Sequence, residues 1–281
     1  MAGSYERRML RVIDHIHDNP AGDLSLDALA EVAAMSRFHW HRVFQGLTGE
    51  TVTQCVRRMR MQRAAVMLAQ GDPGLPLTVV AARVGYPNRS SFVRAFTDSF
   101  GMAPSVFRKR DELRPFTNFL TRKVSNMSDV ALRIHAARSL AAVAHSGAYH
   151  EIGRAFEKLS AVMASRDLFR QAGAMVGVYY DNPSLTPAPQ LRSHAGFEVP
   201  AKVALAAPLT RVTLAAGKHA VLTHCGPYAG LPAAYDELFG VWLPQSGHEA
   251  ADAPAFEVYL NTPMDTAAED LLTELWLPLL G

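Results

Sequence analysis

The position of Glu257 in this chain requires a chemical explanation. It lies in the otherwise apolar stretch AFEVYL, residues 255–260. If this stretch is a strand, alternate side chains share a face, and Tyr259 lies on the same side as Glu257. A buried carboxylate needs a partner, and one surrounded by aromatic rings attracts a lipophilic cation. The pattern predicts a cation-binding site, with a surface strand residue or an internal ion pair as the alternatives.

Other aromatic residues are candidate walls of this site, although each of them could equally pack in a core. They are Tyr149, Tyr180, Tyr228, Trp242 and Trp276. No spacing of His, Cys and Asp suggests a zinc site, and the sequence contains no glycine-rich phosphate loop and no nucleophile elbow. We therefore expect no metal and no cofactor, and we name no catalytic residue.

A sequence motif occurs twice in the second half of the chain. HSGAYHEI (145–152) and HCGPYAGL (224–231) lie 79 positions apart. The same offset aligns several other pairs and places Val178 opposite Glu257. The aligned pairs are Phe156 with Tyr235, Leu159 with Leu238, Tyr180 with Tyr259, Asn182 with Asn261, and Phe197 with Trp276. Two copies of one supersecondary unit are predicted. Because His145 and His224 are themselves duplicated, a structural role is favoured for both.

Each copy predicts strands that flank one helix. The expected helices are residues 152–164 and 231–243, and alternating apolar segments before and after them predict strands. We expect a duplicated β-α-β-β domain with an antiparallel sheet and helices on one face. The seam between two such copies is a favoured place for a small-molecule site.

Charge divides the chain into a basic and an acidic part. Residues 1–123 contain 18 Lys and Arg against 11 Asp and Glu, whereas residues 124–281 contain 10 against 15. The basic part suits nucleic acid, and a solvated basic surface is the alternative. No apolar run is long enough for a membrane span, and no signal peptide is evident. The two cysteines form no framework, so a cytoplasmic protein is expected.

The basic part predicts two similar helical pairs. A short helix (26–33), a turn at Ala34-Met35 and a helix capped by Ser36 are followed by a second set. In that set a short helix is followed by the turn Gly85-Tyr86-Pro87, and Asn88 caps the helix 89–100. This order is typical of the helix-turn-helix, so an all-α double helix-turn-helix domain is expected.

A helix over residues 51–70 connects the two pairs, and its length of ~30 Å suits adjacent major grooves. Arg42 and Arg94 could read guanine or hold phosphate. Exposed-face candidates beside them are His41, Arg89, Ser90 and Val93. The connecting helix carries four arginines, which we expect to be phosphate contacts or surface charge. They are Arg57, Arg58, Arg60 and Arg63.

Residues 5–112 resemble an AraC/XylS-type DNA-binding domain. The resemblance is carried by LSLDALAEVAAMSRFHWHRVFQGLTGET and LTVVAARVGYPNRSSFVRAFTDSFGMAPSVFRKR. It implies seven helices and a transcription regulator. The family's base-reading positions fall on Phe38, His41 and Arg42 in the first reader helix and on Arg89, Ser90, Val93 and Arg94 in the second.

Residues 129–281 resemble a GyrI-like effector-binding domain. The residues that carry this are the two HxGxY phrases, YDNP (180–183), WLPQSG (242–247) and FEVYLN (256–261). The resemblance implies a pocket for bulky, often cationic aromatic molecules. The family's ligand-contacting acid falls on Glu257.

These observations predict a DNA-binding domain (1–112), a linker (113–128) and an effector-binding domain (129–281). The expected function is that of a ligand-responsive transcription regulator. Its expected partners are a double-stranded DNA operator, a small-molecule effector that is lipophilic and cationic, and RNA polymerase. Two alternatives stay open for the second domain, namely a hydrolase of reactive aromatic toxins and a protein-binding module. The operator, the effector, the sign of regulation and the oligomeric state are not predicted.

Overall fold

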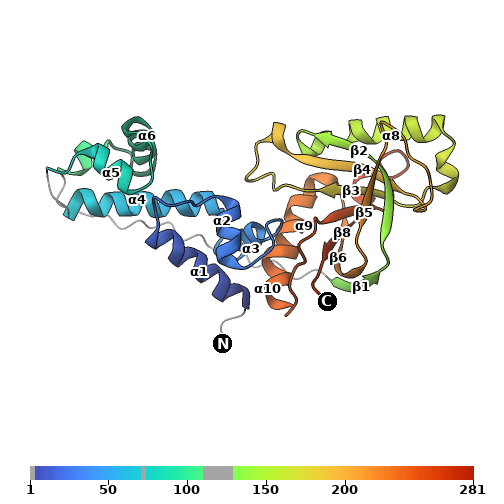
Figure 1. Ribbon diagram of the computed structural model, residues 1–281, viewed down its shortest axis with the longest axis horizontal. Helices are drawn as coiled ribbons and strands as arrows, with labels where there is room; N and C mark the ends of the chain where they lie inside the picture. The colour runs from blue at the N-terminus through green and yellow to red at the C-terminus, as the bar shows by residue number, and fades with distance from the viewer. Residues whose placement is uncertain (1–3, 71–73, 110–128) are drawn as a thin grey trace. The chain divides into compact units, whose positions relative to one another are not determined.

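The computed structural model describes residues 4–70, 74–109 and 129–281 of the protein (Figure 1). Described residues up to 35 and from 47 to 109 belong to one compact unit, and residues 36–46 and 129–281 belong to another. The expected linker, residues 113–128, lies outside the described residues. No helix among the described residues is long and apolar enough to cross a membrane.

Seven helices occupy the described residues up to 109, as the resemblance to AraC/XylS-type domains implies. They are α1 (Ser4–Asp18), α2 (Leu26–Ala33), α3 (Trp40–Thr48), α4 (Val52–Gln70), α5 (Leu77–Arg83), α6 (Arg89–Phe100) and α7 (Pro104–Phe107).

Short polar side chains cap the start of two of these helices, and a glycine ends one of them. The Ser25 hydroxyl accepts a hydrogen bond from the Ala28 amide at the start of α2, and the Asn88 side chain accepts one from Ser91 at the start of α6. These bonds satisfy amides that the first helical turn leaves without a partner. Gly101 ends α6 in the left-handed conformation, with φ of 70°.

The helix α3 begins later than the sequence suggests. Ser36 was expected to cap a helix that starts at Arg37, but the regular helix starts at Trp40. The Ser36 hydroxyl instead accepts a hydrogen bond from the Phe38 amide, and residues 37–39 form a turn. Phe38 therefore precedes the helix that it was expected to belong to.

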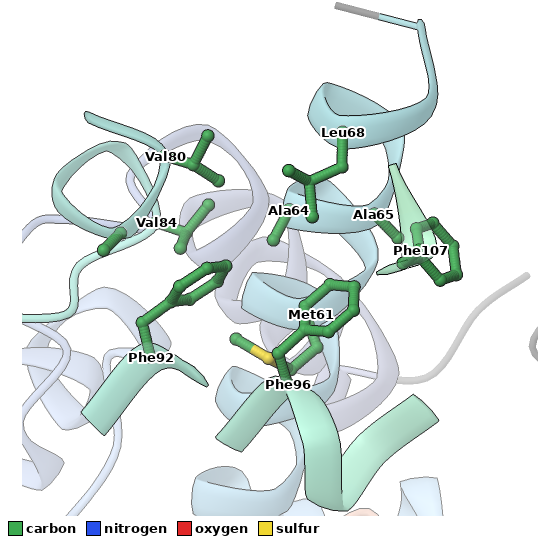
Figure 2. Packing of buried hydrophobic residues seen from close by; sticks show 10 residues of the cluster. Met61, Ala64, Ala65, Leu68, Val80, Val84, Phe92, Phe96 and Phe107 are labelled. Carbon is green, nitrogen blue, oxygen red and sulfur yellow. The ribbon is translucent and has the colours of Figure 1, made fainter. Parts of the chain in front are cut away.

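A core of aromatic and aliphatic side chains fastens α6 to α4 (Figure 2). Phe92 and Phe96 of α6 are fully buried, and the Phe96 ring lies 5.3 Å from that of Phe107. The helix α4 contributes Met61 and Leu68 to the same cluster. Burial of each large side chain contributes about 1.5–3 kcal/mol. The second reader helix is therefore held by packing on its inner face, which leaves its outer face free.

The other unit is built on an eight-stranded antiparallel sheet (Figure 1). The first repeat contains β1 (Val130–His135), β2 (Arg138–Ser146), α8 (Gly153–Ser165), β3 (Met175–Tyr179) and β4 (Arg192–Glu198). The second contains β5 (Thr210–Leu214), β6 (Gly217–Cys225), α9 (Leu231–Glu237), β7 (Phe256–Tyr259) and β8 (Leu272–Pro278). Each repeat thus has one strand more than the expected β-α-β-β order, because both of the alternating segments that precede its helix form strands.

The repeats are joined at their centre and exchange their first strands. The order of strands is β1-β6-β8-β7-β3-β4-β2-β5, so β3 and β7 form the seam between the two repeats. The strand β1 pairs with β6 of the second repeat, and β5 pairs with β2 of the first. The arrangement is the same when read from either edge, as a twofold duplication requires.

The offset between the repeats changes from 79 to 80 within the second helix. The strands Arg138–Ser146 and Gly217–Cys225 differ by 79, whereas Arg192–Glu198 and Leu272–Pro278 differ by 80. The left-handed residues that follow the helices, Asp167 and Gly247, also differ by 80. Between α9 and α10 (Leu243–Gln245) the second helix contains a π turn over Leu238–Trp242. A π turn holds one more residue than an α turn, which accounts for the change.

This change corrects the alignment made from the sequence. With an offset of 80, the counterpart of Glu257 is Gly177 and not Val178. The expected pairs Tyr180 with Tyr259, Asn182 with Asn261, and Phe197 with Trp276 fall after the π turn and are wrong by one residue. The structural counterpart of Tyr259 is Tyr179.

Candidate functional sites

Glu257 lies on the seam between the two repeats. It pairs with Gly177 of β3 on one side and with Leu275 of β8 on the other. Its side chain is only 4% exposed. The sequence therefore placed the acid in the right kind of element, and the structure shows that it is buried at the centre of the sheet.

Two tyrosine hydroxyls connect to the Glu257 carboxylate in series. The Tyr259 hydroxyl donates to Glu257 Oε2 over 2.7 Å, and the Tyr179 and Tyr259 hydroxyl oxygens are 2.6 Å apart. A hydroxyl has one proton to donate. Because Tyr259 directs its proton at the carboxylate, Tyr179 donates to the oxygen of Tyr259. The chain of donors ends on Glu257, which makes the carboxylate the acceptor of the whole group.

Burial determines the protonation behaviour of this group. It raises the pKa of Glu257 above its usual value, and the tyrosine hydrogen bonds oppose that rise. The pKa values of Tyr179, Tyr235 and Tyr259 are raised well above 10, first by burial and then by the charge of Glu257. The tyrosines thus stay protonated and serve as donors, while a nearby positive charge would stabilise the ionised form of Glu257.

Aromatic rings surround the carboxylate, and five of the eight tyrosines in the chain belong to this group. The Tyr259 ring packs edge-on against Phe156 at 5.6 Å and Tyr228 at 5.5 Å. Tyr149 packs against Tyr179 at 4.8 Å. The hydroxyls of Tyr228 and Tyr235 are also buried. The Tyr235 hydroxyl acts on Glu257 as a hydrogen-bond donor and lowers its pKa, whereas the Tyr228 hydroxyl has no hydrogen-bond partner among the described residues. Burial first, and then the charge of Glu257, raises the pKa of Tyr228 and of Tyr235.

Gly177 makes room for the tyrosine pair. A Cβ at position 177 would lie 2.9 Å from the hydroxyl oxygens of both Tyr179 and Tyr259. Real side chains do not come so close, so any larger residue would displace the two hydroxyls. The counterpart of the acid is therefore a glycine, and the seam carries one carboxylate and not two.

The Tyr149 side chain is fixed by the backbone. Its hydroxyl donates to the Asp181 carbonyl and accepts from the Asp181 amide, each over 2.8 Å. Asp181 is in turn paired with Arg192 over 2.7 Å. Burial raises the pKa of Tyr149 to about 12. This tyrosine therefore acts as a rigid wall and does not offer its hydroxyl to a ligand.

Three of the predicted wall residues do not join the others around Glu257. Residues that pair across strands share a face, and neighbours along a strand alternate. Trp276 pairs with Phe256 and so lies on the opposite face of the sheet. Tyr180 follows Tyr179 and packs against His194 on that same opposite face. Trp242 ends the π turn and stacks against His248 at 6.2 Å.

The sequence reasoning missed Tyr179, Tyr235 and Phe156 as neighbours of Glu257. Phe156 and Tyr235 had been aligned with each other, and each lies on the helix that covers its repeat. That match was the signal that both point toward the seam. Tyr179 was hidden by the offset of 79, which gave its role to Tyr180.

The two duplicated histidines have local partners. His145 Nδ1 lies 3.0 Å from the Ser193 hydroxyl, and His224 Nε2 lies 3.2 Å from the Pro227 carbonyl. Among the residues that the structure describes, no three His, Cys, Asp or Glu side chains gather to hold a metal ion.

A second candidate site lies on the outer face of α6. Arg89, Ser90 and Arg94 are exposed, and Val93 is half-buried against the core. A hollow of about 400 Å³ lies beside them. It is lined by Arg57, Tyr86, Ser90, Ser91, Arg94, Ala95 and Asp98. Exposed guanidinium and hydroxyl groups on one helix face can bond to base edges and to phosphates.

The candidates near α3 are less exposed than those of α6. His41 is 6% exposed, and Arg42 and Phe38 are half-buried. Of the seven predicted DNA-contacting residues, the structure thus places three on an open helix face.

Comparison with known proteins assigns both parts of the chain. Residues 131–280, more than half of the chain, match the GyrI-like small molecule binding domain. The chain belongs to the GyrI-like family. Residues 29–110 match a helix-turn-helix domain, which is of the AraC type. This GyrI-like protein therefore joins an AraC-type domain at its N-terminal side to a GyrI-like domain.

Relatives of the N-terminal part carry regulatory names. The RCS-specific HTH-type transcriptional activator RclR of Escherichia coli (strain K12) is 34% identical over 103 residues, which is 37% of this chain and 36% of RclR. The multiple antibiotic resistance protein MarA of Escherichia coli (strain K12) is 29% identical over 34% of this chain and 75% of MarA. The chain thus spans only about a third of RclR.

A solved structure overlaps the other part. An uncharacterized conserved protein from Listeria innocua is 14% identical and covers 55% of this GyrI-like chain and 93% of its own, with a TM-score of 0.46. An overlap of this extent carries no statement about function.

Gly177→Ala tests whether the tyrosine pair requires a glycine beneath it. We expect this variant to lose about 1–3 kcal/mol of unfolding free energy, because the added methyl displaces two buried hydroxyls. Urea unfolding followed by circular dichroism measures the change. The matched control is Gly153→Ala, since nothing lies within 4 Å of a Cβ at that helical position. A loss no greater than that of the control would contradict the packing described here.

Glu257→Gln tests the burial of the acid through pH. Because the pKa of Glu257 is raised in the folded protein, the folded state holds this proton more tightly than the unfolded state. The wild type should be most stable relative to the variant below the usual Glu pKa. It should lose that advantage as the pH rises through the raised value, by about 1.4 kcal/mol for each pH unit that separates the folded and unfolded pKa values. Urea unfolding of both proteins between pH 4 and pH 8 measures this, and a constant difference would refute it.

Proposed function

We propose that this protein is a sequence-specific DNA-binding transcription regulator that responds to a lipophilic cation bound beside Glu257. The observation that carries the proposal is the single carboxylate, 4% exposed, at the seam of two repeats and surrounded by tyrosines. The DNA-binding part rests on the exposed face of α6 and on the AraC-type domain that contains it.

The chemistry of the seam favours a cation over a neutral molecule. Burying an ionised carboxylate costs free energy unless a positive charge or several donors compensate for it. Tyr259 donates to Glu257, and the Tyr235 and Tyr179 hydroxyls and the charge of Arg42 also lower its pKa. Burial nevertheless keeps that pKa above its usual value, and the described residues form no ion pair with Glu257. A cation with an aromatic or aliphatic body would meet the carboxylate and the negative faces of the tyrosine rings together.

The protein's own hydroxyls compensate in part for the buried carboxylate when no ligand is bound. In this proposal the cation takes the place of the Tyr259 hydroxyl at Glu257 Oε2, to which Tyr179 is linked in turn. A ligand must therefore move these hydroxyls aside, and its affinity is reduced by the cost of breaking their hydrogen bonds. Tyr228 then offers a hydroxyl that has no other partner among the described residues.

Regulation requires that the ligand bind two states of the protein with different affinity. Rearrangement of the tyrosines on binding provides a local difference between a free and a bound state. The proposed result is a change in DNA binding or in the recruitment of RNA polymerase.

A titration of the full-length protein with tetraphenylphosphonium tests the ligand proposal. Isothermal calorimetry should show saturable binding to the wild type. Glu257→Gln should weaken it about tenfold or more, equivalent to about 1.4 kcal/mol, because the variant lacks the negative charge. Neutral triphenylphosphine oxide should bind the two proteins equally.

Glu274→Gln is the matched control for this titration. Glu274 is also a buried acid, but it is on the opposite face of the sheet and is paired with Arg133. It should leave cation binding unchanged. If wild type and Glu257→Gln bind the cation equally well, Glu257 is not the binding site. Chemical conversion of an aromatic ligand during incubation would favour the hydrolase instead.

Arg94→Ala tests the DNA-binding face. A target is first selected from a pool of randomised DNA duplexes with the wild-type protein. If Arg94 reads a base, its loss should weaken binding to that target by about 1–3 kcal/mol and spare binding to random DNA. Arg83→Ala, an exposed arginine at the end of α5, is the control. An equal loss on both DNAs would assign Arg94 to phosphate.

A further inference from the structure

Arg60 lies in the middle of α4, between the two helical pairs. Its Nε donates to the Pro20 carbonyl over 2.7 Å, and its guanidinium lies 5.9 Å from the centre of the Tyr86 ring. Pro20 belongs to the turn between α1 and α2, and Tyr86 to the turn between α5 and α6. Burial lowers the pKa of Arg60, consistent with a side chain that is packed and not solvated. One side chain of α4 therefore connects the turn that precedes the first pair to the turn within the second pair.

Gly85 shows that the two turns also touch each other. Its φ is 76°, and a Cβ there would lie 2.4 Å from the Pro20 carbonyl oxygen and 2.6 Å from Arg60 Nη2. These distances are too short for any side chain. The glycine is required both by its backbone conformation and by this close approach. The turn of the second helix-turn-helix thus rests directly on the turn that follows α1.

Neighbouring arginines of α4 reinforce the same arrangement. Arg63 Nη1 donates to the His17 carbonyl near the end of α1 over 3.0 Å, and Arg57 pairs with Asp98 of α6 over 3.1 Å. The sequence suggested phosphate contacts or surface charge for these arginines, but the structure gives each a partner within the protein. Charged donors on backbone carbonyls are among the stronger hydrogen bonds.

These contacts bear on the geometry of DNA reading. A single helix that connects two reading units can bend, and a bend changes the distance between the sequences that the units reach. The contacts of Arg60 and Gly85 close a second connection beside α4. With two connections, the second helix-turn-helix cannot rotate freely against α1 and α2, from which the chain continues into α3.

We propose that Arg60 is a positioning residue that fixes the base-pair spacing between the two DNA elements read by this protein. The inference rests on the proposed DNA-binding function. Arg60 contacts no DNA in this proposal and acts by holding the Pro20 turn against the Gly85 turn. Adding one base pair moves an element by about 3.4 Å along the duplex and rotates it by about a tenth of a turn. A protein with the Arg60 contacts should bind the altered duplex more weakly, whereas a protein without them should bind both duplexes with similar affinity.

The test compares spacing preference and not affinity alone. Wild-type protein selects its target from randomised duplexes, and the two elements within it are located by single-base changes. Duplexes with one base pair added or removed between the elements are then titrated with full-length wild type and Arg60→Met. We expect the wild type to lose about tenfold or more for either change. Arg60→Met should lose less than about threefold, because methionine keeps the length of the stem but donates nothing.

Arg58→Met is the matched control, since Arg58 is on the same helix but bonds to Glu50 beside its start. It should keep the wild-type spacing preference. Arg60→Lys retains a charged donor and should restore part of that preference. Thermal unfolding of every variant separates loss of spacing from loss of fold, since a purely structural role would lower stability without relaxing the spacing.

Two results would overturn the inference. If the Arg60→Met variant loses as much affinity for altered spacing as the wild type does, the contacts of Arg60 do not set the spacing. Wild-type protein that selects no DNA sequence would remove the proposed function, and the inference with it.

Discussion

The arrangement of residues at the centre of the C-terminal sheet depends on one buried carboxylate. Glu257 is on a strand that is buried throughout, and the cost of burying its charge must be met by neighbouring groups. Tyr259 donates to it, and Tyr179 donates to Tyr259. These two hydroxyls need space above position 177, so the partner strand carries a glycine there. The identity of four residues on two strands thus follows from one desolvated group.

The same constraint breaks the symmetry of the duplication. Both repeats present a tyrosine to the seam, and both covering helices present an aromatic ring, Phe156 and Tyr235. Only one repeat supplies the acid. Because Gly177 and Glu257 pair directly, a second carboxylate at position 177 would lie against the first and repel it. The duplicated domain therefore carries one carboxylate at its seam, and its two halves are chemically different there.

The local features of the fold were predictable from the sequence, whereas the alignment of the repeats was only partly so. Ser25 and Asn88 cap their helices because short polar side chains reach free amides, a rule that needs no tertiary information. The duplication was visible in HSGAY and HCGPY. The π turn was not visible, because an extra residue inside a helix leaves the apolar pattern almost intact. It shifted everything that follows, so Tyr180 was assigned the place of Tyr179.

Packing also decided which residues could join the site. Trp276 has the right chemistry for a cation site, but the alternation of strand residues puts it on the far face, where its ring stacks against Phe256. In this case the pattern of residue types was right about the strand and wrong about the direction of the side chain. The direction in which a side chain points depends on what packs against each face of its strand or helix, and a single sequence does not show this.

The exchange of first strands has a consequence for how the chain acquires this structure. Val130 of β1 pairs with Leu222 of β6, so the first strand made has no partner until most of the second repeat exists. During synthesis the first repeat is made before β6, the strand with which β1 pairs. The first repeat therefore cannot complete its part of the sheet alone. The two repeats are alike in shape, yet neither is a unit of folding. The smallest part that can close its own sheet is the pair.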